Sequence, residues 1–319
     1  MPMVSPVPPR PVDPVAAFLS DACAGRTDPA RPILIAGPTA SGKSGLALAI
    51  ARANGRGIVN ADSLQVYGGW RVLTARPSDA DLARAPHALF GPVPPDQDYT
   101  VGQWLRDAGP LLCQRPAPVI VGGTGLYFTA LTEGLADIPA TTPVLRARAT
   151  AHLARDGLDA MAGALDPDTQ ARIDLRNPMR VQRAWEVQTQ TGRGLAAWQD
   201  DTAPPLVPLA SALPLLLTAD REWLAARIAA RFEAMLAAGA LDEARTMMAD
   251  WDPARLSSKA IGAAELIAHL RGDLSLEAAR TATLLATRRY AKRQRTWFRN
   301  RMGAWWSADA QEIGRMFGE

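Results

Sequence analysis

The chain has 319 residues, of which 48% are hydrophobic and 21% charged, a composition typical of a globular protein with a substantial buried core. Its apolar runs are all shorter than the roughly 18 uncharged residues that a spanning helix needs, so we expect no membrane insertion. The two cysteines, Cys23 and Cys113, are too few for a disulfide framework or a metal site, which favours a cytoplasmic protein.

The first thirty residues are rich in proline and lack the charged-then-apolar order of a signal peptide. We expect residues 1–30 to be disordered, except for one possible short helix over 14–24. A buried strand is predicted at 33–36, followed by a glycine-rich turn and a helix over about 43–53.

Further strands are predicted at 57–60, 117–123 and 213–220, with a helix over 101–113. Strands that alternate with helices indicate an α/β fold with a parallel sheet, here with a P-loop NTPase-like core. Ligands of such sheets gather at the carboxyl ends of the strands. The polar motifs after residues 36, 60 and 121 all fall at those ends.

The middle of the chain, 138–205, reads as helices with a basic face and is predicted to be a helical insertion domain. The core then comprises 31–137 and 206–319. Its C-terminal part is predicted to be mainly helical, with helices over 221–239, 241–250, 258–270 and 275–300.

The segment GPTASGKS fits the pattern G-x-x-x-x-G-K-[ST] and lies between a strand and a helix, as that motif requires. Backbone N–H groups of such a loop converge on phosphate oxygens, and the helix dipole adds positive potential. Lys43 would neutralise the terminal phosphates, and Ser44 would offer its hydroxyl to Mg²⁺. The predicted phosphate-binding residues are Gly37, Pro38, Thr39, Ala40, Ser41, Gly42, Lys43 and Ser44. The motif does not specify the phosphate ester.

A nucleotide hydrolase or kinase normally has a metal-binding Asp at the end of a later strand. Here the strand over 117–121 ends instead in a flexible-looking turn, Gly122-Gly123-Thr124-Gly125, and the well-placed carboxylate is Asp62. One carboxylate, one hydroxyl and a phosphate cradle suit a transfer in which a base takes a proton and pyrophosphate departs. Asp62 could equally cap the turn that follows its strand.

A block of seven cations without an acidic residue lies near the C-terminus: Arg288, Arg289, Lys292, Arg293, Arg295, Arg299 and Arg301. Such a block indicates a polyanionic partner, although a solvated helix face is the alternative. The interleaved Tyr290, Trp297 and Phe298 suit nucleic acid as well as core packing.

Eight segments in this order make the chain resemble the tRNA dimethylallyltransferase family. They are GPTASGKS (37–44), NADSLQVYGG (60–69), TARP (74–77), PHALF (86–90), VGGTGLYF (121–128), NPMRVQRAWEV (177–187), DREWLAARIAARFEAML (220–236) and TRRYAKRQRTWFR (287–299). Each segment alone is unspecific, but the ordered set is specific and spans about 31–300.

The resemblance implies transfer of a dimethylallyl group from dimethylallyl diphosphate to N6 of the tRNA adenosine 3′ of the anticodon, position 37. The pyrophosphate would occupy the loop over 37–44, with Mg²⁺ at Ser44. Asp62 would accept the N6 proton, and Thr124 would donate toward the bridging oxygen of the leaving group. Arg221, with Arg227 and Arg231, would add positive charge against the pyrophosphate.

The resemblance also implies that tRNA is the partner of a chain that acts as a monomer. The flipped adenine would be held by Asp62, Ser63, Leu64 and Gln65. The insertion would contact the anticodon loop through Met179, Arg180, Val181, Gln182 and Arg183. From the basic block we assign Arg293 and Arg295 to tRNA binding.

The chain departs from the family pattern at three places. Residues 68–73 read GGWRVL where the family has a basic residue followed by M-D-I-G, and Met179 stands where glutamine is common. The family's I-G-Y-[KR]-E is here Ile261-Gly262-Ala263-Ala264-Glu265. The last departure puts in doubt any anticodon-loop contact by that segment.

Two other functions are compatible with part of the sequence. A P-loop kinase of a small metabolite would explain the phosphate loop, but not the insertion or the basic helix. An ATP-regulated RNA-binding protein would leave the polar turn around Asp62 unexplained.

Overall fold

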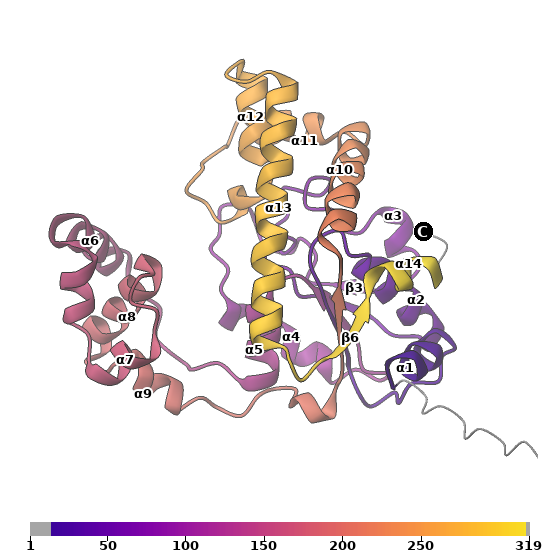
Figure 1. The fold of residues 1–319 in the computed structure, drawn as a ribbon, viewed down its shortest axis with the longest axis horizontal. Helices are drawn as coiled ribbons and strands as arrows, with labels where there is room; N and C mark the ends of the chain where they lie inside the picture. The colour runs from indigo at the N-terminus through magenta and orange to yellow at the C-terminus, as the bar shows by residue number, and fades with distance from the viewer. Residues whose placement is uncertain (1–13, 317–319) are drawn as a thin grey trace, which may run out of the picture. The chain divides into compact units, whose positions relative to one another are not determined.

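The structure is a computed structural model that describes residues 14–316 and builds its core on one six-stranded sheet (Figure 1). The strands are β1 (Ile33–Ala36), β2 (Ile58–Asn60), β3 (His87–Ala88), β4 (Val119–Gly122), β5 (Leu213–Thr218) and β6 (Trp306–Asp309). They lie in the order β3-β2-β4-β1-β5-β6, and every pair is parallel. The predicted α/β fold is confirmed.

The chain divides into two compact units, and the first contains the sheet, with described residues 14–129 and 209–316. Its helices are α1 (Pro14–Cys23), α2 (Lys43–Asn54), α3 (Asp79–Leu82), α4 (Val101–Leu112), α5 (Gly125–Glu133), which runs on into the second unit, α10 (Arg221–Ala237), α11 (Ala240–Met247), α12 (Ala263–Arg271), α13 (Leu276–Arg301) and α14 (Ala310–Met316). Single 3-10 turns lie at η1 (Leu209–Ser211) and η2 (Ser257–Lys259). Helix α13, the long golden helix of Figure 1, packs on α10 and α12. Within 14–316, no helix is both long and apolar enough to cross a membrane.

The strands next to the phosphate loop are buried because their side chains are almost all apolar. Every residue of β1 and β4 is buried, and β5 is buried except at its last residue. Helix α1 packs Phe18, Leu19 and Ala22 into the same core. The short helix expected over 14–24 is present as α1, whose apolar face is buried, whereas the expected disorder is wrong for residues 25–30. Residues 1–13 lie outside the described part of the chain.

One prediction about the C-terminal part is corrected, and one strand there was missed. The single helix predicted over 258–270 is a 3-10 turn at Ser257–Lys259 followed by α12. Gly262 separates them with a φ of +95°, a left-handed conformation that continues no helix. The edge strand β6 was not predicted, since WSAD is short and half-exposed.

The second unit, Ala130–Pro208, contains α6 (Pro143–Gly163), α7 (Pro167–Arg172), α8 (Pro178–Thr191) and α9 (Leu195–Asp200), and no strand. The predicted insertion, 138–205, falls inside it. Its core is small and consists of Met161, Val181 and Ala184 with their neighbours.

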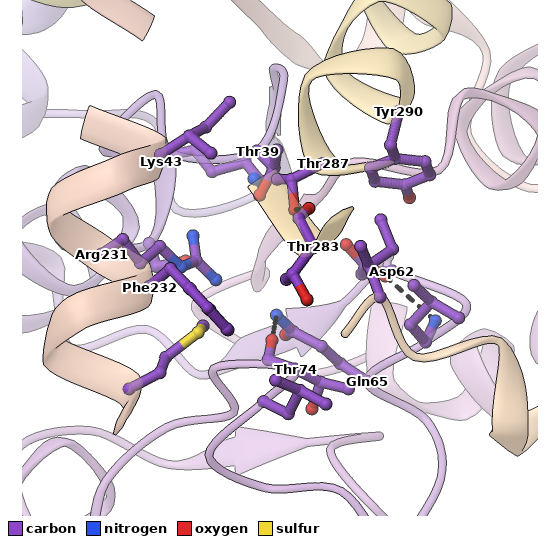
Figure 2. A pocket seen from close by; sticks show the side chains of 16 residues that line it. Thr39, Lys43, Asp62, Gln65, Thr74, Arg231, Phe232, Thr283, Thr287 and Tyr290 are labelled. Carbon is purple, nitrogen blue, oxygen red and sulfur yellow. Dashed lines mark hydrogen bonds between the residues drawn. The ribbon is translucent and has the colours of Figure 1, made fainter. Parts of the chain in front are cut away.

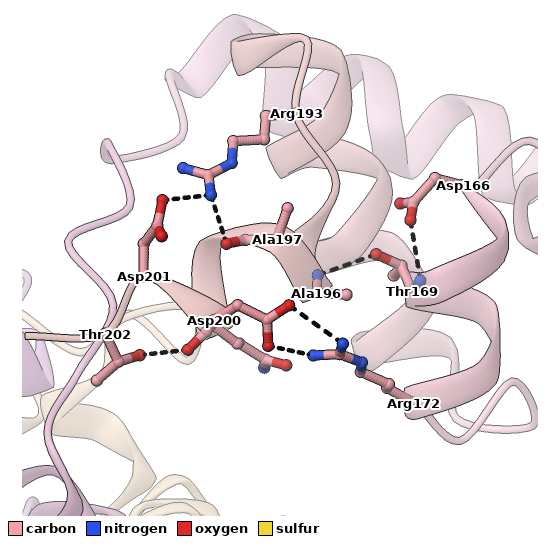
Figure 3. A network of polar contacts seen from close by, with 10 residues as sticks. Asp166, Thr169, Arg172, Arg193, Ala196, Ala197, Asp200, Asp201 and Thr202 are labelled. Carbon is pink, nitrogen blue, oxygen red and sulfur yellow. Dashed lines mark hydrogen bonds and ion pairs between the residues drawn. The ribbon is translucent and has the colours of Figure 1, made fainter.

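Polar contacts supplement this small core (Figure 3). Arg172 makes a bidentate ion pair with Asp200, at 2.6 and 3.1 Å, which joins α7 to the end of α9. Thr169 is fully buried, and its hydroxyl accepts a hydrogen bond from Ala196 N at 3.0 Å. Arg193 donates to the Ala197 carbonyl at 2.6 Å and pairs with Asp201. These bonds fix the short helices where apolar burial alone is limited.

Candidate active site

The three polar segments found in the sequence meet at one edge of the sheet. They follow β2, β4 and β1, which are neighbours in that order, so their carboxyl ends lie side by side. Backbone hydrogen bonds join two of the segments, from Ala61 N to Val121 O (2.8 Å) and from Thr124 N to Ala61 O (3.1 Å).

A cavity lies against this edge, within the first unit (Figure 2). Its walls come from the phosphate loop, the segment after β2, α10 and α13. The lining residues are Thr39, Lys43, Ser44, Asp62, Leu64, Gln65, Leu73, Thr74, Ile228, Arg231, Phe232, Met235, Ile261, Thr283, Thr287 and Tyr290. One part is therefore polar and charged and the other is apolar, as an amphiphilic ligand requires.

Lys43 is a buried cation at the polar side of the cavity. Only 8% of it is exposed, and its ammonium group donates to the Pro38 carbonyl at 3.2 Å. Burial lowers the pKa of Lys43 to about 8, an effect that Asp62 opposes and Arg231 reinforces. An anionic ligand would therefore strongly stabilise the charged form of this lysine.

We expect the affinity for an alkyl diphosphate to fall as pH rises through 8. The unliganded Lys43 loses its proton there, and binding of the anion must first restore it. Between pH 7 and pH 9 the affinity should drop about tenfold. Calorimetry with isopentyl diphosphate, which does not react, measures this directly. Constant affinity across the range would contradict the assignment, and a Lys43→Met variant should show a flat profile.

Arg231 is the arginine of α10 that lines the cavity, on the same side as Lys43 in Figure 2. Burial lowers its pKa, and Asp62 opposes the shift. Arg227 holds the phosphate loop instead, through a bond from Nε to the Ala40 carbonyl at 3.1 Å. Arg221, predicted to bind the diphosphate, is exposed and lines a different groove, so the structure does not bring it to this cavity.

Both predicted roles of Asp62 are compatible with its position. Its Oδ1 accepts a hydrogen bond from Leu64 N at 3.0 Å, which closes the turn after β2. Its carboxylate also lines the cavity. Asn60, fully buried, fixes the backbone of Asp62 by accepting from its N–H (2.9 Å) and donating to its carbonyl (3.0 Å). The carboxylate is thus held rigidly at the cavity wall.

Ser63, Leu64 and Gln65 were predicted to hold the acceptor base. Leu64 and Gln65 line the cavity, whereas Ser63 does not. The side-chain amide of Gln65 donates to the Thr74 carbonyl at 2.9 Å. This bond ties the polar segment after β2 to a wall of the cavity.

Thr124 does not line the cavity. Its hydroxyl accepts from Ser63 N at 2.9 Å and donates to Ser63 Oγ at 3.2 Å, so it supports the turn that carries Asp62. Its predicted contact with the leaving group stays a prediction. The turn itself is packed tightly rather than flexible: a Cβ on Gly123 would lie 2.3 Å from Gln294 Nε2, and one on Gly125 would lie 2.1 Å from Trp297.

One face of α13 closes the site with polar side chains, namely Thr283, Thr287, Tyr290 and Gln294. Their spacing of four, three and four residues puts them on one stripe. Burial, the largest effect, raises the pKa of Tyr290, and Asp62 adds to it. Of the aromatic side chains of this block, Phe298 is buried (2% exposed), Tyr290 lines the cavity and Trp297 is half-buried. Sequence reasoning missed this stripe, although its helical spacing was visible.

The opposite face of α13 carries cations. A groove between α10 and α13 is lined by Arg221, Arg288, Arg289, Lys292, Arg295 and Arg299, together with apolar residues. None of these six forms an ion pair with a carboxylate of the described residues. Arg293 lies outside the groove, and its guanidinium stacks on Tyr290 at 5.7 Å. The groove is suited to a polyanion.

The residues of α8 predicted to touch tRNA differ in their exposure. Met179 is 75% exposed and Arg180 is exposed, whereas Val181 is fully buried in the core of the second unit. Gln182 donates to Glu186 at 3.0 Å, and Arg183 donates to Thr141. Met179 and Arg180 therefore remain the residues of α8 best placed for an external ligand.

The residues that could hold a metal ion are few. Within 14–316, no three His, Cys, Asp or Glu side chains form a metal cluster. The Ser44 hydroxyl and the Asp62 carboxylate both line the cavity. This donor set fits Mg²⁺, which usually takes one or two protein oxygens and completes its shell with phosphates and water.

Together, the parallel sheet, the glycine-rich loop and the facing carboxylate are those of a P-loop protein with a phosphate-binding loop beside a carboxylate. The comparisons narrow this class. The chain belongs to the IPP transferase family, whose model matches residues 65–301, and the isopentenyl transferase model matches residues 31–87.

Curated relatives and solved structures agree with this family. A tRNA dimethylallyltransferase of Cereibacter sphaeroides is 60% identical over 277 residues, 87% of this chain and 95% of the relative. One from Jannaschia is 59% identical over 88% of this chain and 96% of its own. The crystal structure of the tRNA isopentenylpyrophosphate transferase from Bacillus halodurans matches with a TM-score of 0.62 and 30% identity, over 90% and 95% of the two chains.

Proposed function

We propose that the chain transfers a dimethylallyl group from dimethylallyl diphosphate to N6 of adenosine 37 in tRNA and releases diphosphate. The observation that carries the proposal is the composition of one cavity. Lys43 and Arg231 offer positive charge for a diphosphate, Phe232 and Leu73 offer an apolar wall, and Asp62 lines the same cavity. Relatives named for this activity share about 60% of the sequence.

The diphosphate of the donor would lie against Thr39, Lys43 and Ser44, and Arg231 would add positive charge to it. The bond from the allylic carbon to the bridging oxygen breaks, and its electron pair leaves with the diphosphate. The adenine N6 lone pair forms the new C–N bond. Asp62 accepts the N6 proton, so atoms and charge balance. A positioned base of this kind is worth about 10²–10⁴ in rate.

The apolar side of the cavity would hold the dimethylallyl group and keep water away from the allylic carbon. The residues there are Leu64, Leu73, Ile228, Phe232, Met235 and Ile261. Mg²⁺ held at Ser44 would neutralise the departing diphosphate. Stretching of the allylic bond leaves positive charge on carbon, which the Asp62 carboxylate also stabilises.

A metabolite kinase, the alternative, fits the cavity less well. Such an enzyme needs a hydrophilic acceptor site, whereas this cavity includes an apolar part lined by Leu73, Phe232 and Met235, among others. Incubation with radiolabelled dimethylallyl diphosphate and unmodified tRNA separates the two. Label should enter the RNA without ATP. Consumption of ATP without transfer of label to the RNA would contradict the proposal.

We also propose that the exposed cations of α13 bind the phosphate backbone of the tRNA. Replacing Lys292 and Arg295 together by Ala should weaken tRNA binding and flatten its dependence on salt by roughly one to two units of the log–log slope. Filter binding over a series of KCl concentrations measures the slope. Arg26→Ala, which removes an exposed arginine paired with Asp21, is the matched control. An unchanged slope would mean that the groove does not touch phosphate.

We further propose that the protein works in the cytoplasm as a monomer. Its two cysteines, Cys23 and Cys113, are both free. Light scattering at micromolar concentration tests the oligomeric state.

A further inference from the structure

Gln294 lies buried between the two glycine-rich segments of the site, and only 6% of it is exposed. Its Oε1 accepts a hydrogen bond from the backbone N–H of Thr39 in the phosphate loop, at 2.9 Å. Its Nε2 donates to the carbonyl of Gly123 in the turn after β4, also at 2.9 Å. One side-chain amide thus joins two loops that belong to different strands.

Both partners fix the orientation of this amide. A backbone N–H can only donate and a carbonyl can only accept, so the oxygen must face Thr39 and the nitrogen must face Gly123. An ionised glutamate only accepts, and a lysine only donates. The close approach also requires glycine at position 123, because a Cβ there would lie 2.3 Å from Nε2. The contact therefore depends on both the donor and the acceptor of the amide and on the length of the glutamine side chain.

The two loops hold opposite sides of the reaction site. Thr39 lines the cavity together with Lys43. Gly123 precedes Thr124, whose hydroxyl accepts from Ser63 N, next to Asp62. A Cβ on Gly123 would also lie 3.3 Å from Asp62 Oδ2, so this turn passes close to the carboxylate. The amide of Gln294 therefore spans the distance between the diphosphate loop and the base.

We propose that Gln294 is a positioning residue that sets the separation between the diphosphate loop and the turn carrying Asp62. The inference rests on the proposed prenyl transfer. We call the two hydrogen bonds of the Gln294 amide, to Thr39 and Gly123, the clasp. Without the clasp, each loop keeps its own strand and helix, but the distance between the two loops is free to change. The rate depends on that spacing, since a shift of about 1 Å can cost 10²-fold.

Gln294→Glu makes the clasp depend on pH. The protonated carboxyl has the shape of the amide and can donate to Gly123 while it accepts from Thr39. The ionised form places a negative oxygen against the Gly123 carbonyl. We expect kcat of this variant to lie about 10- to 100-fold below wild type at pH 8.5. The ratio of variant to wild type should recover at pH 6, because burial keeps the carboxyl protonated to higher pH than in water.

Gln294→Leu has a similar volume and no polar group, so its loss of kcat should be the same at both pH values. Both variants should keep the KM for tRNA. A ratio for Gln294→Glu that does not change with pH would overturn the proposal. So would lowered melting temperatures combined with normal turnover per folded molecule, since that pattern indicates a purely structural residue.

Failure of the clasp is distinguishable from failure of the proposed function. Calorimetry with isopentyl diphosphate reports on the phosphate loop without any transfer to tRNA. The Gln294→Glu variant should bind it more weakly relative to wild type at pH 8.5 than at pH 6. If wild type transfers no label yet this pH pattern holds, the clasp stands and the acceptor is wrong.

Discussion

Asp62→Asn should lower kcat by about 10²–10⁴ while tRNA binds as before. Asparagine keeps an oxygen that can accept from Leu64 N, so the turn after β2 survives, but its amide cannot take a proton at neutral pH. The loss is therefore chemical rather than structural. Single-turnover transfer of labelled dimethylallyl, measured at saturating tRNA, gives the rate of that step.

Asp62→Ala is the companion variant, because it removes the base and the turn acceptor together. It should lose the same activity and some thermal stability, whereas Asp62→Asn should melt close to wild type. Turnover near the wild-type level in the Asn variant would refute the base assignment. It would leave Asp62 as the cap of a turn, the other role that its contact with Leu64 supports.

Lys43→Met should weaken binding of alkyl diphosphates by about 10- to 150-fold. Hydrogen bonds to charged groups contribute about 1.5–3 kcal/mol, and a methionine of similar length leaves the packing of the loop nearly intact. Calorimetry with isopentyl diphosphate measures the change, and the affinity for tRNA alone should not move.

Lys259→Met is the matched control, since Lys259 lies outside the cavity and donates to the Pro253 carbonyl at 2.7 Å. Equal affinities of the Lys43 variant and wild type would mean that the diphosphate does not contact this lysine. The buried ammonium beside Asp62 would then be a feature of folding alone.

The strands that position the site were predictable because each is a short apolar run bounded by turn residues. The strands β1, β2, β4 and β5 all lie within two residues of their predicted bounds. The two-residue β3 and the half-exposed β6 carry no such run, since an edge strand buries little. The helix predicted over 258–270 is interrupted at Gly262, because this glycine has a positive φ. The neighbouring residues in the sequence do not indicate that conformation.

The residues of the candidate site also fall into those that could be predicted from the sequence and those that could not. Lys43 ends the glycine-rich loop that follows β1, and Asp62 lies two residues after β2, so their place at the sheet edge could be predicted from the chain alone. Phe232, Thr283 and Gln294 reach the site from α10 and α13, and their arrival depends on how those helices pack. That packing also explains Arg221, which shares α10 with Arg231 but lines the groove instead of the cavity.

The two faces of α13 have a consequence for how the family can vary. An α-helix turns about 100° per residue, so a one-residue deletion near Ala279 would rotate every later side chain by that angle. Gln294 would leave its loops, and the cations of the groove would turn toward new neighbours. A substitution in α13 changes one side chain on one face, whereas an insertion or deletion displaces the side chains of both faces at once. We therefore expect the number of residues between Gly262 and Phe298 to be fixed more strictly than their identities.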